Sequence, residues 1–131
     1  MNAAIMIGFV ALAAVMQPAM GQDGSREMAI VLPEHGKTSS YEGTIRGYGG
    51  ADYVFKAPAG RKLRIELKTK STSTYFNLAQ DGKDDALFVG SVGGNIFEAA
   101  LPVDGAYRIK VYQMRNAARK GATARYALHV R

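Results

Sequence analysis

Residues 107–120 read YRIKVYQMRNAARK and contain two patterns in succession. In the first half, apolar or aromatic residues recur at every second position, which is the period of a half-buried β-strand: Tyr107, Ile109 and Val111. From Met114 to Lys120 the alternation stops, and the segment is too short for a stable independent helix. This second half has no acid and three cations, which are Arg115, Arg119 and Lys120. The two patterns predict a rigid strand that delivers a cationic loop to one end of a β-domain, and we expect this loop to act by binding.

The same alternation recurs along the chain between turns rich in Gly, Pro and Asp. It is clearest at residues 62–70, where Leu63, Ile65 and Leu67 alternate with charged residues. Further strands are expected at residues 27–32, 41–46, 51–56, 74–79, 86–89, 96–101 and 123–130, with glycine-rich turns at 47–50 and 90–94. Short strands at this spacing predict an all-β fold, a single-domain antiparallel β-sandwich of about eight strands with no amphipathic helix.

The N-terminus has the pattern of an export signal. Residues 2–20 carry no charge, and residues 5–16 are apolar except for one Gly. That run is shorter than the roughly 20 apolar residues that span a bilayer. Pro18 and the small residues up to Gly21 then suit a signal peptidase. We expect a signal peptide at residues 1–21, removed to leave a domain of residues 22–131 with no stable membrane insertion; an uncleaved membrane anchor is the alternative.

The chain contains no cysteine. This excludes a disulfide framework, a thiolate metal site, a cysteine nucleophile and an N-terminal lipid-modified cysteine. An exported protein without disulfides is more typical of a bacterial periplasm than of a eukaryotic secretory route. We therefore expect a soluble periplasmic protein.

The positive charge is concentrated toward the C-terminus. The net charge is +6, and no acid follows Asp104, whereas seven cations do: Arg108, Lys110, Arg115, Arg119, Lys120, Arg125 and Arg131. The partner is expected to present negative potential near that end of the chain. Because an exported protein seldom meets nucleic acid, an acidic cleft, an anionic glycan or a lipid headgroup ranks above DNA. A basic surface that only maintains solubility is the alternative.

Catalytic chemistry has little support in the sequence. His35 and His129 belong to no spaced ligand set, so no metal site and no cofactor are expected. Ser71 and Ser73 lack the glycines of a nucleophile elbow. The acids of residues 81–85 lack the alternating ligands and terminal Glu of an EF-hand, which favours a solvated hairpin tip. The chain is expected not to be an enzyme.

Several segments together resemble the periplasmic inhibitors of goose-type (g-type) lysozyme. In chain order they are YEGTIRGY at 41–48, DYVFKA at 52–57, AGRKL at 59–63, TYF at 74–76, LPVDGAY at 101–107 and RNAARK at 115–120. The first and the last are the most specific. The resemblance implies a β-sandwich that blocks the substrate cleft of a host or competitor lysozyme and protects bacterial peptidoglycan. Where lysozyme inhibitors commonly carry Ser-Gly before a Tyr, this chain has Asp104 and Gly105, so c-type and i-type lysozymes stay open as targets.

The resemblance also assigns site residues. Lysozyme cleaves its substrate with carboxyl groups in a deep groove, to which an entering guanidinium can make charge-assisted bonds. The residues assigned to lysozyme binding are Tyr48, Arg115, Asn116, Arg119 and Lys120, with Tyr48 as an aromatic anchor and Lys120 at the rim. Asp104, Gly105 and Tyr107 are assigned to loop support. In the alternative interpretation, the two arginines are merely solvated, Tyr48 packs over its own loop, and Asp104 only forms a turn.

Two other functions fit the same sequence. A non-catalytic carbohydrate- or peptidoglycan-binding β-sandwich would use Tyr48, Tyr53 or Tyr112 to stack on sugars. A basic envelope protein with a structural role would account for the charge alone. The inhibitor hypothesis differs from both because it requires the Tyr48 loop and the Arg115–Lys120 segment to lie at the same end of the sandwich.

Overall fold

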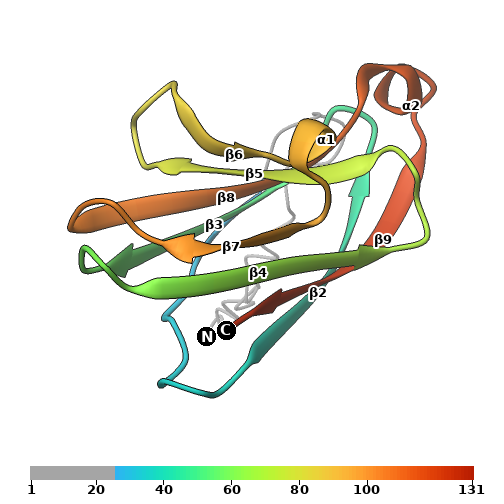
Figure 1. Cartoon of the computed structure of the whole chain (residues 1–131). Coiled ribbons are helices and arrows are strands. Elements are labelled where there is room, and N and C mark those ends of the chain that lie inside the picture. The colour runs from blue at the N-terminus through green and yellow to red at the C-terminus, as the bar shows by residue number, and fades with distance from the viewer. Residues whose placement is uncertain (1–25) are drawn as a thin grey trace, which may run out of the picture.

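The computed structural model describes residues 26–131 and consists of two β-sheets packed face to face (Figure 1). The expected signal peptide at residues 1–21 lies outside the described residues. The elements are β1 (Arg26–Ala29), β2 (Ser39–Arg46), β3 (Ala51–Ala57), β4 (Lys62–Thr69), β5 (Thr74–Gln80), β6 (Ala86–Val89), α1 (Gly90–Gly93), β7 (Ile96–Ala100), β8 (Gly105–Gln113), α2 (Arg115–Arg119) and β9 (Thr123–Val130). The all-β sandwich expected from the sequence is confirmed.

The two sheets have the strand orders β1-β3-β8-β5-β6 and β2-β9-β4-β7. The strand of residues 107–113 is therefore central, because β8 lies between β3 and β5. All pairings are antiparallel except that of β1 with β3, which is parallel, with Met28 beside Tyr53. Within residues 26–131, neither helix is long and apolar enough to cross a membrane.

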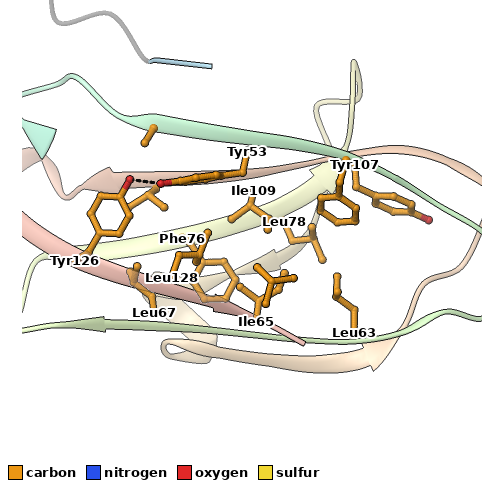
Figure 2. Packing of buried hydrophobic residues seen from close by; sticks show 14 of the residues in the cluster. Tyr53, Leu63, Ile65, Leu67, Phe76, Leu78, Tyr107, Ile109, Tyr126 and Leu128 are labelled. Atoms are coloured by element: carbon orange, nitrogen blue, oxygen red, sulfur yellow. Dashed lines mark hydrogen bonds between the residues drawn. The ribbon is translucent and has the colours of Figure 1, made fainter. Parts of the chain in front are cut away.

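The core lies between the sheets and is formed by the apolar positions of the alternating strands (Figure 2). Leu63, Ile65 and Leu67 of β4 are buried, as their alternation predicts. Each such side chain contributes about 1.5–3 kcal/mol by leaving water. At one side of this apolar layer the phenol oxygens of Tyr53 and Tyr126 are hydrogen-bonded at 2.6 Å (Figure 2). Tyr53 is thus a core residue, and the idea that it stacks on sugars is wrong.

Three local expectations differ from the structure. The first strand ends at Ala29 rather than at residue 32, although Ile30 N still donates to Val54 O at 2.8 Å. The turn expected at 90–94 contains one helical turn, α1. The cationic loop contains the short helix α2, whose residue Ala118 is buried and whose two alanines have the highest helix propensity. Gly121, with φ of 68°, follows α2 in a conformation that other residues rarely adopt.

Candidate functional site

A buried glutamine holds two separate loops at one end of the sandwich. Gln113 is the last residue of β8, and its side-chain Nε2 donates to Ala122 O at 2.6 Å and to Gly47 O at 3.3 Å. Gly47 N also donates to Ala122 O at 2.9 Å. A buried amide without partners would be costly, so these bonds fix the three chain segments relative to one another. The turn at 47–50 and the segment at 114–122 therefore lie side by side, as the inhibitor hypothesis requires.

A third loop, at residues 70–73, joins the same end. Met114 N donates to Ser73 O at 2.7 Å, which ties the start of the cationic segment to the turn between β4 and β5. That turn is itself bonded internally, because Thr74 Oγ1 donates to Ser71 Oγ at 2.8 Å. We call the turns at 47–50 and 70–73 and the segment at 114–122 together the loop end; α2 lies on it, where β8 ends and β9 begins (Figure 1).

The helix α2 exposes the polar residues assigned from the sequence. Arg115 and Arg119 are four residues apart and so lie on one helix face, and Asn116 and Lys120 form an equivalent pair beside them. All four side chains are exposed, and none makes a side-chain hydrogen bond or an ion pair within residues 26–131. Like charges at this spacing destabilise a helix, as does a cation in its first turn. Arg119 in the last turn is favourably placed at the helix C-terminus, but the charge of Arg115 does not serve the stability of α2.

Tyr48 stands beside α2 in the neighbouring turn. Its side chain is 54% exposed and makes no hydrogen bond within the described residues. The turn is closed behind it by Gly49 N, which donates to Arg46 O at 2.9 Å. An exposed ring on a fixed turn can enter a partner's pocket with little loss of conformational entropy.

Two residues at this end of the sandwich were missed from the sequence. One is Gln113, whose signal was available: it occupies a core position in the alternation of β8 and is polar. The other is Met114, a large apolar side chain that is 38% exposed at the start of the segment. Adaptable Met side chains are common on binding surfaces.

Asp104, Gly105 and Tyr107 lie at the opposite end of β8 from α2. Asp104 Oδ1 accepts a hydrogen bond from Ala59 N at 2.6 Å, which links two turns at that far end. Tyr107 is fully buried, and its hydroxyl donates to Val103 O at 2.6 Å. These residues therefore brace the turn that precedes β8, and the length of the strand separates them from the cationic segment that we expected them to support.

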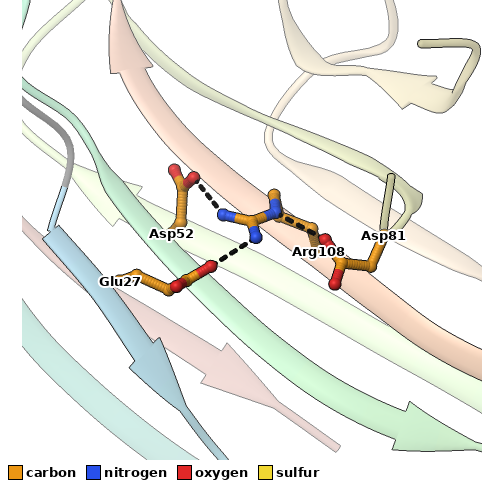
Figure 3. Close-up of polar contacts among 4 residues, drawn as sticks. All are labelled: Glu27, Asp52, Asp81 and Arg108. Carbon is orange, nitrogen blue, oxygen red and sulfur yellow. Dashed lines mark hydrogen bonds and ion pairs between the residues drawn. The ribbon is translucent and has the colours of Figure 1, made fainter. Parts of the chain in front are cut away.

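One of the C-terminal cations is neutralised on the outer face of the larger sheet. The guanidinium of Arg108 lies among three carboxylates, bonding Asp52 at 2.6 Å, Asp81 at 3.0 Å and also Glu27 of β1 (Figure 3). The hydrogen bond with Asp52 is the main cause that raises the pKa of Arg108 further above its ordinary value. This cluster fastens the edge strand β1 to β8. Within the part of the chain that the structure describes, cations without an ion-pair partner lie elsewhere, and those of α2 are among them.

The loop end offers chemistry for binding an acidic surface rather than for a reaction. Within residues 26–131, no three His, Cys, Asp or Glu side chains are placed to hold a metal ion. His129 Nδ1 and Ser40 Oγ are hydrogen-bonded at 2.7 Å on β9 and β2 of the smaller sheet, away from α2. What converges at the loop end is two guanidinium groups, an ammonium group, an amide and a phenol on a fixed backbone.

Comparison with known proteins gives a consistent result. No family model matches the chain. A protein of Escherichia coli K12 described as an inhibitor of g-type lysozyme is 30% identical over 96 residues, which is 71% of this chain and 71% of that protein. The crystal structure of PliG from Aeromonas hydrophila, a periplasmic lysozyme inhibitor of g-type lysozyme, matches with a TM-score of 0.67 and 27% identity, covering 82% of this chain and 97% of that one.

The fold itself is not confined to inhibitors. The pre-peptidase C-terminal domain of a collagenase from Bacillus anthracis matches with a TM-score of 0.61 at 19% identity, covering 82% of this chain and 97% of that domain. At this identity the likeness shows a shared sandwich only. The relationship to the two inhibitors rests on sequence as well as on shape.

Proposed function

This chain belongs to the family of inhibitors of g-type lysozyme, and from that premise we propose that it is a periplasmic inhibitor whose loop end inserts into the substrate cleft of a g-type lysozyme. The observation that carries the proposal is the convergence of Tyr48 with Arg115 and Arg119 on one backbone-bonded end. By blocking the cleft, the protein protects bacterial peptidoglycan from lysis.

Charge complementarity supplies the first part of the mechanism. A lysozyme cleft contains carboxyl groups that act on the glycan. Arg115 and Arg119 project from the same helix face and have no ion-pair partner within residues 26–131, so neither has to break an ion pair with that part of the chain before it binds. A guanidinium can make two parallel hydrogen bonds to one carboxylate, and such bonds strengthen when water is excluded.

Neutral contacts and one peripheral cation complete the proposed interface. Tyr48 supplies an aromatic anchor in the adjacent turn, and Met114 supplies exposed apolar area at the start of the segment at 114–122. Asn116 offers an amide donor and acceptor next to Arg115, and Lys120 lies one turn further along, where it is expected to act at the rim on the association rate. Because Gln113 and the bonds of Met114 and Gly47 hold the backbone, little ordering is needed when the complex forms.

The test is inhibition of lysozyme on a cell-wall substrate. Goose-type, chicken-type and invertebrate-type lysozymes are each titrated with the protein and with an Arg115→Ala/Arg119→Ala variant. We expect stoichiometric inhibition of the goose-type enzyme and an affinity about 100-fold lower for the variant, the loss typical of removing interface hot spots. Tyr48→Ala is expected to weaken inhibition about tenfold.

A matched control separates the loop end from net charge. The variant Lys62→Ala/Arg131→Ala removes two positive charges from exposed positions at the far end of the smaller sheet and is expected to inhibit like the wild type. Equal losses in the two double variants would show that only the overall charge matters. No inhibition of any lysozyme type at micromolar protein would refute the proposal.

A further inference from the structure

A groove of about 1010 Å³ crosses the outer face of the smaller sheet, over β2, β9 and β4. Its floor is low because Ala127 of β9 lies between Glu42 of β2 and Lys68 of β4, its partners in the two neighbouring strands. The two longer side chains rise on either side of that alanine. The groove is separate from the residues proposed to bind lysozyme, because neither Tyr48 nor any residue of α2 lines it.

The charges of the groove are unbalanced. Three cations line it, Lys68, Lys70 and Arg125, against a single acid, Glu42. Lys70 and Arg125 have no ion-pair partner within residues 26–131. Lys68 forms one long ion pair, in which its Nζ lies 3.6 Å from Oε1 of Glu66. An exposed pair of that kind neutralises little charge.

The strand register forces two of these cations together. Thr69 is paired with Tyr126, and the Thr69 hydroxyl donates to Arg125 O at 2.7 Å. The residue after Thr69, Lys70, therefore lies beside Arg125 at the end of β4. Like charges on neighbouring strands repel, and a bound anion would turn this repulsion into attraction.

The dimensions of the groove favour an extended ligand over a free ion. A single carboxylate or phosphate would fill a small part of 1010 Å³. The remaining surface carries exposed hydroxyl groups, those of Thr44 and Thr123, which make no side-chain hydrogen bond within the described residues. Hydroxyl groups beside cations suit a saccharide that carries carboxylates.

We propose that this groove binds peptidoglycan, a glycan whose stem peptides carry free carboxylates, so that the inhibitor is held on the polymer that it protects. The choice of glycan rests on the proposed function, which places the protein beside peptidoglycan. Lys70 and Arg125 bind the carboxylates, and the threonine hydroxyls bind the sugar hydroxyls. The groove includes Lys70 and Ser71 of the turn at 70–73 but neither Tyr48 nor any residue of α2, so the side chains proposed to enter the lysozyme cleft are not the ones that bind the wall.

The experiment measures sedimentation of the protein with purified, insoluble peptidoglycan sacculi in the absence of lysozyme. The full chain is purified from the periplasm of an expression host, as wild type, as Lys70→Gln/Arg125→Gln and as the control Lys62→Gln/Arg131→Gln. The control removes the same charge from the other end of the same sheet. We expect an affinity at least about tenfold lower for the groove variant and within about twofold of the wild type for the control. Circular dichroism verifies that each variant is folded.

Sacculi whose carboxylates have been amidated identify the ligand chemistry, and they are expected to bind the wild type as weakly as untreated sacculi bind the groove variant. Failure of the wild type to sediment, or equal losses in both variants, would overturn the proposal. So would a groove variant that sediments normally but no longer inhibits lysozyme, since the groove would then contact the enzyme. The Arg115→Ala/Arg119→Ala variant is expected to sediment normally, so the two proposals can fail independently.

Discussion

The paired hydroxyl groups of Tyr53 and Tyr126 show how single residues constrain this core. The two oxygens are 2.6 Å apart between the sheets, each being the partner that the other needs when buried. Gly43 makes room for this arrangement, since a Cβ at that position would lie 2.6 Å from Cζ of Tyr126. The first glycine of the YEGTIRGY segment, Gly43, is therefore explained by packing.

Removing one hydroxyl should cost more than removing both. Tyr126→Phe leaves the Tyr53 hydroxyl buried without a partner, and we expect a loss of about 1–3 kcal/mol in the free energy of unfolding. Tyr53→Phe/Tyr126→Phe removes both polar groups and is expected to be less destabilising than the single variant. Urea unfolding of the three proteins measures the difference, and a double variant that loses the sum of two single losses would contradict this account.

The same pair predicts loss of stability in alkali. Burial raises the pKa of both Tyr53 and Tyr126 above the ordinary value of about 10. The folded protein therefore keeps protons that the unfolded chain releases, so this contribution is fully present below about pH 10 and declines as pH rises further. Urea unfolding between about pH 8 and pH 11 should show the decline, and the double Phe variant should show a smaller one.

At the scale of elements, the arrangement of the loop end depends on the junction between β8 and α2. Gln113 contributes no contact surface to a partner, because it is buried and bonded to Gly47 and Ala122. Its role is to fix the turn that carries Tyr48 against the segment that carries Arg115. Affinity should depend on this residue even though it cannot touch the lysozyme.

Gln113→Leu should therefore weaken inhibition while leaving the sandwich folded. The substitution keeps the volume but removes the donor, which leaves Gly47 O short of a partner. We expect inhibition to weaken by about tenfold and amide hydrogen exchange to accelerate at residues 114–122 before it does in β4 or β9. Gln80→Leu, at the far end of β5, is the matched control; equal effects of the two substitutions would mean that Gln113 does not position the loops.

Elements with long alternation were predictable from the sequence, and those that depend on tertiary contacts were not. The strands β4, β8 and β9 follow their apolar pattern closely, because one face of each is buried. The parallel pairing of β1 was missed because alternation does not distinguish parallel from antiparallel neighbours. The helix α2 was missed because five residues have little helical stability of their own and rely on the burial of Ala118.

At the scale of the whole molecule, topology brings the candidate site together. The turns at 47–50 and 70–73 and the segment at 114–122 are far apart in the sequence and meet because each connects strands at the same end. The sequence identified Tyr48 and the α2 residues by residue type and resemblance, but strand pairing was needed to show them side by side. For the same reason, only the structure places Asp104 and Tyr107 at the other end.

The overall charge should influence inhibition less than the local charge does. Many lysozymes are basic, so a chain of net charge +6 experiences long-range repulsion that salt screens, while contacts inside a closed cleft are screened less. We expect the inhibition constant to change by less than about tenfold between low and physiological ionic strength, unlike that of a simple polybasic binder. Titrations at several salt concentrations test this, and abolition of binding at physiological salt would exclude cleft insertion.

The loop end is held by backbone groups and by Gln113, while the side chains of Tyr48, Arg115, Asn116, Arg119 and Lys120 make no hydrogen bond or ion pair within residues 26–131. Substitutions at those five positions should consequently be nearly free of folding cost. The recognition residues of such an inhibitor can therefore change during evolution without loss of folding stability. When the target lysozyme changes, natural selection on these residues acts through binding affinity alone. The separation of the groups that stabilise the loop end from the side chains that contact the target is a structural basis for adaptation to new lysozymes.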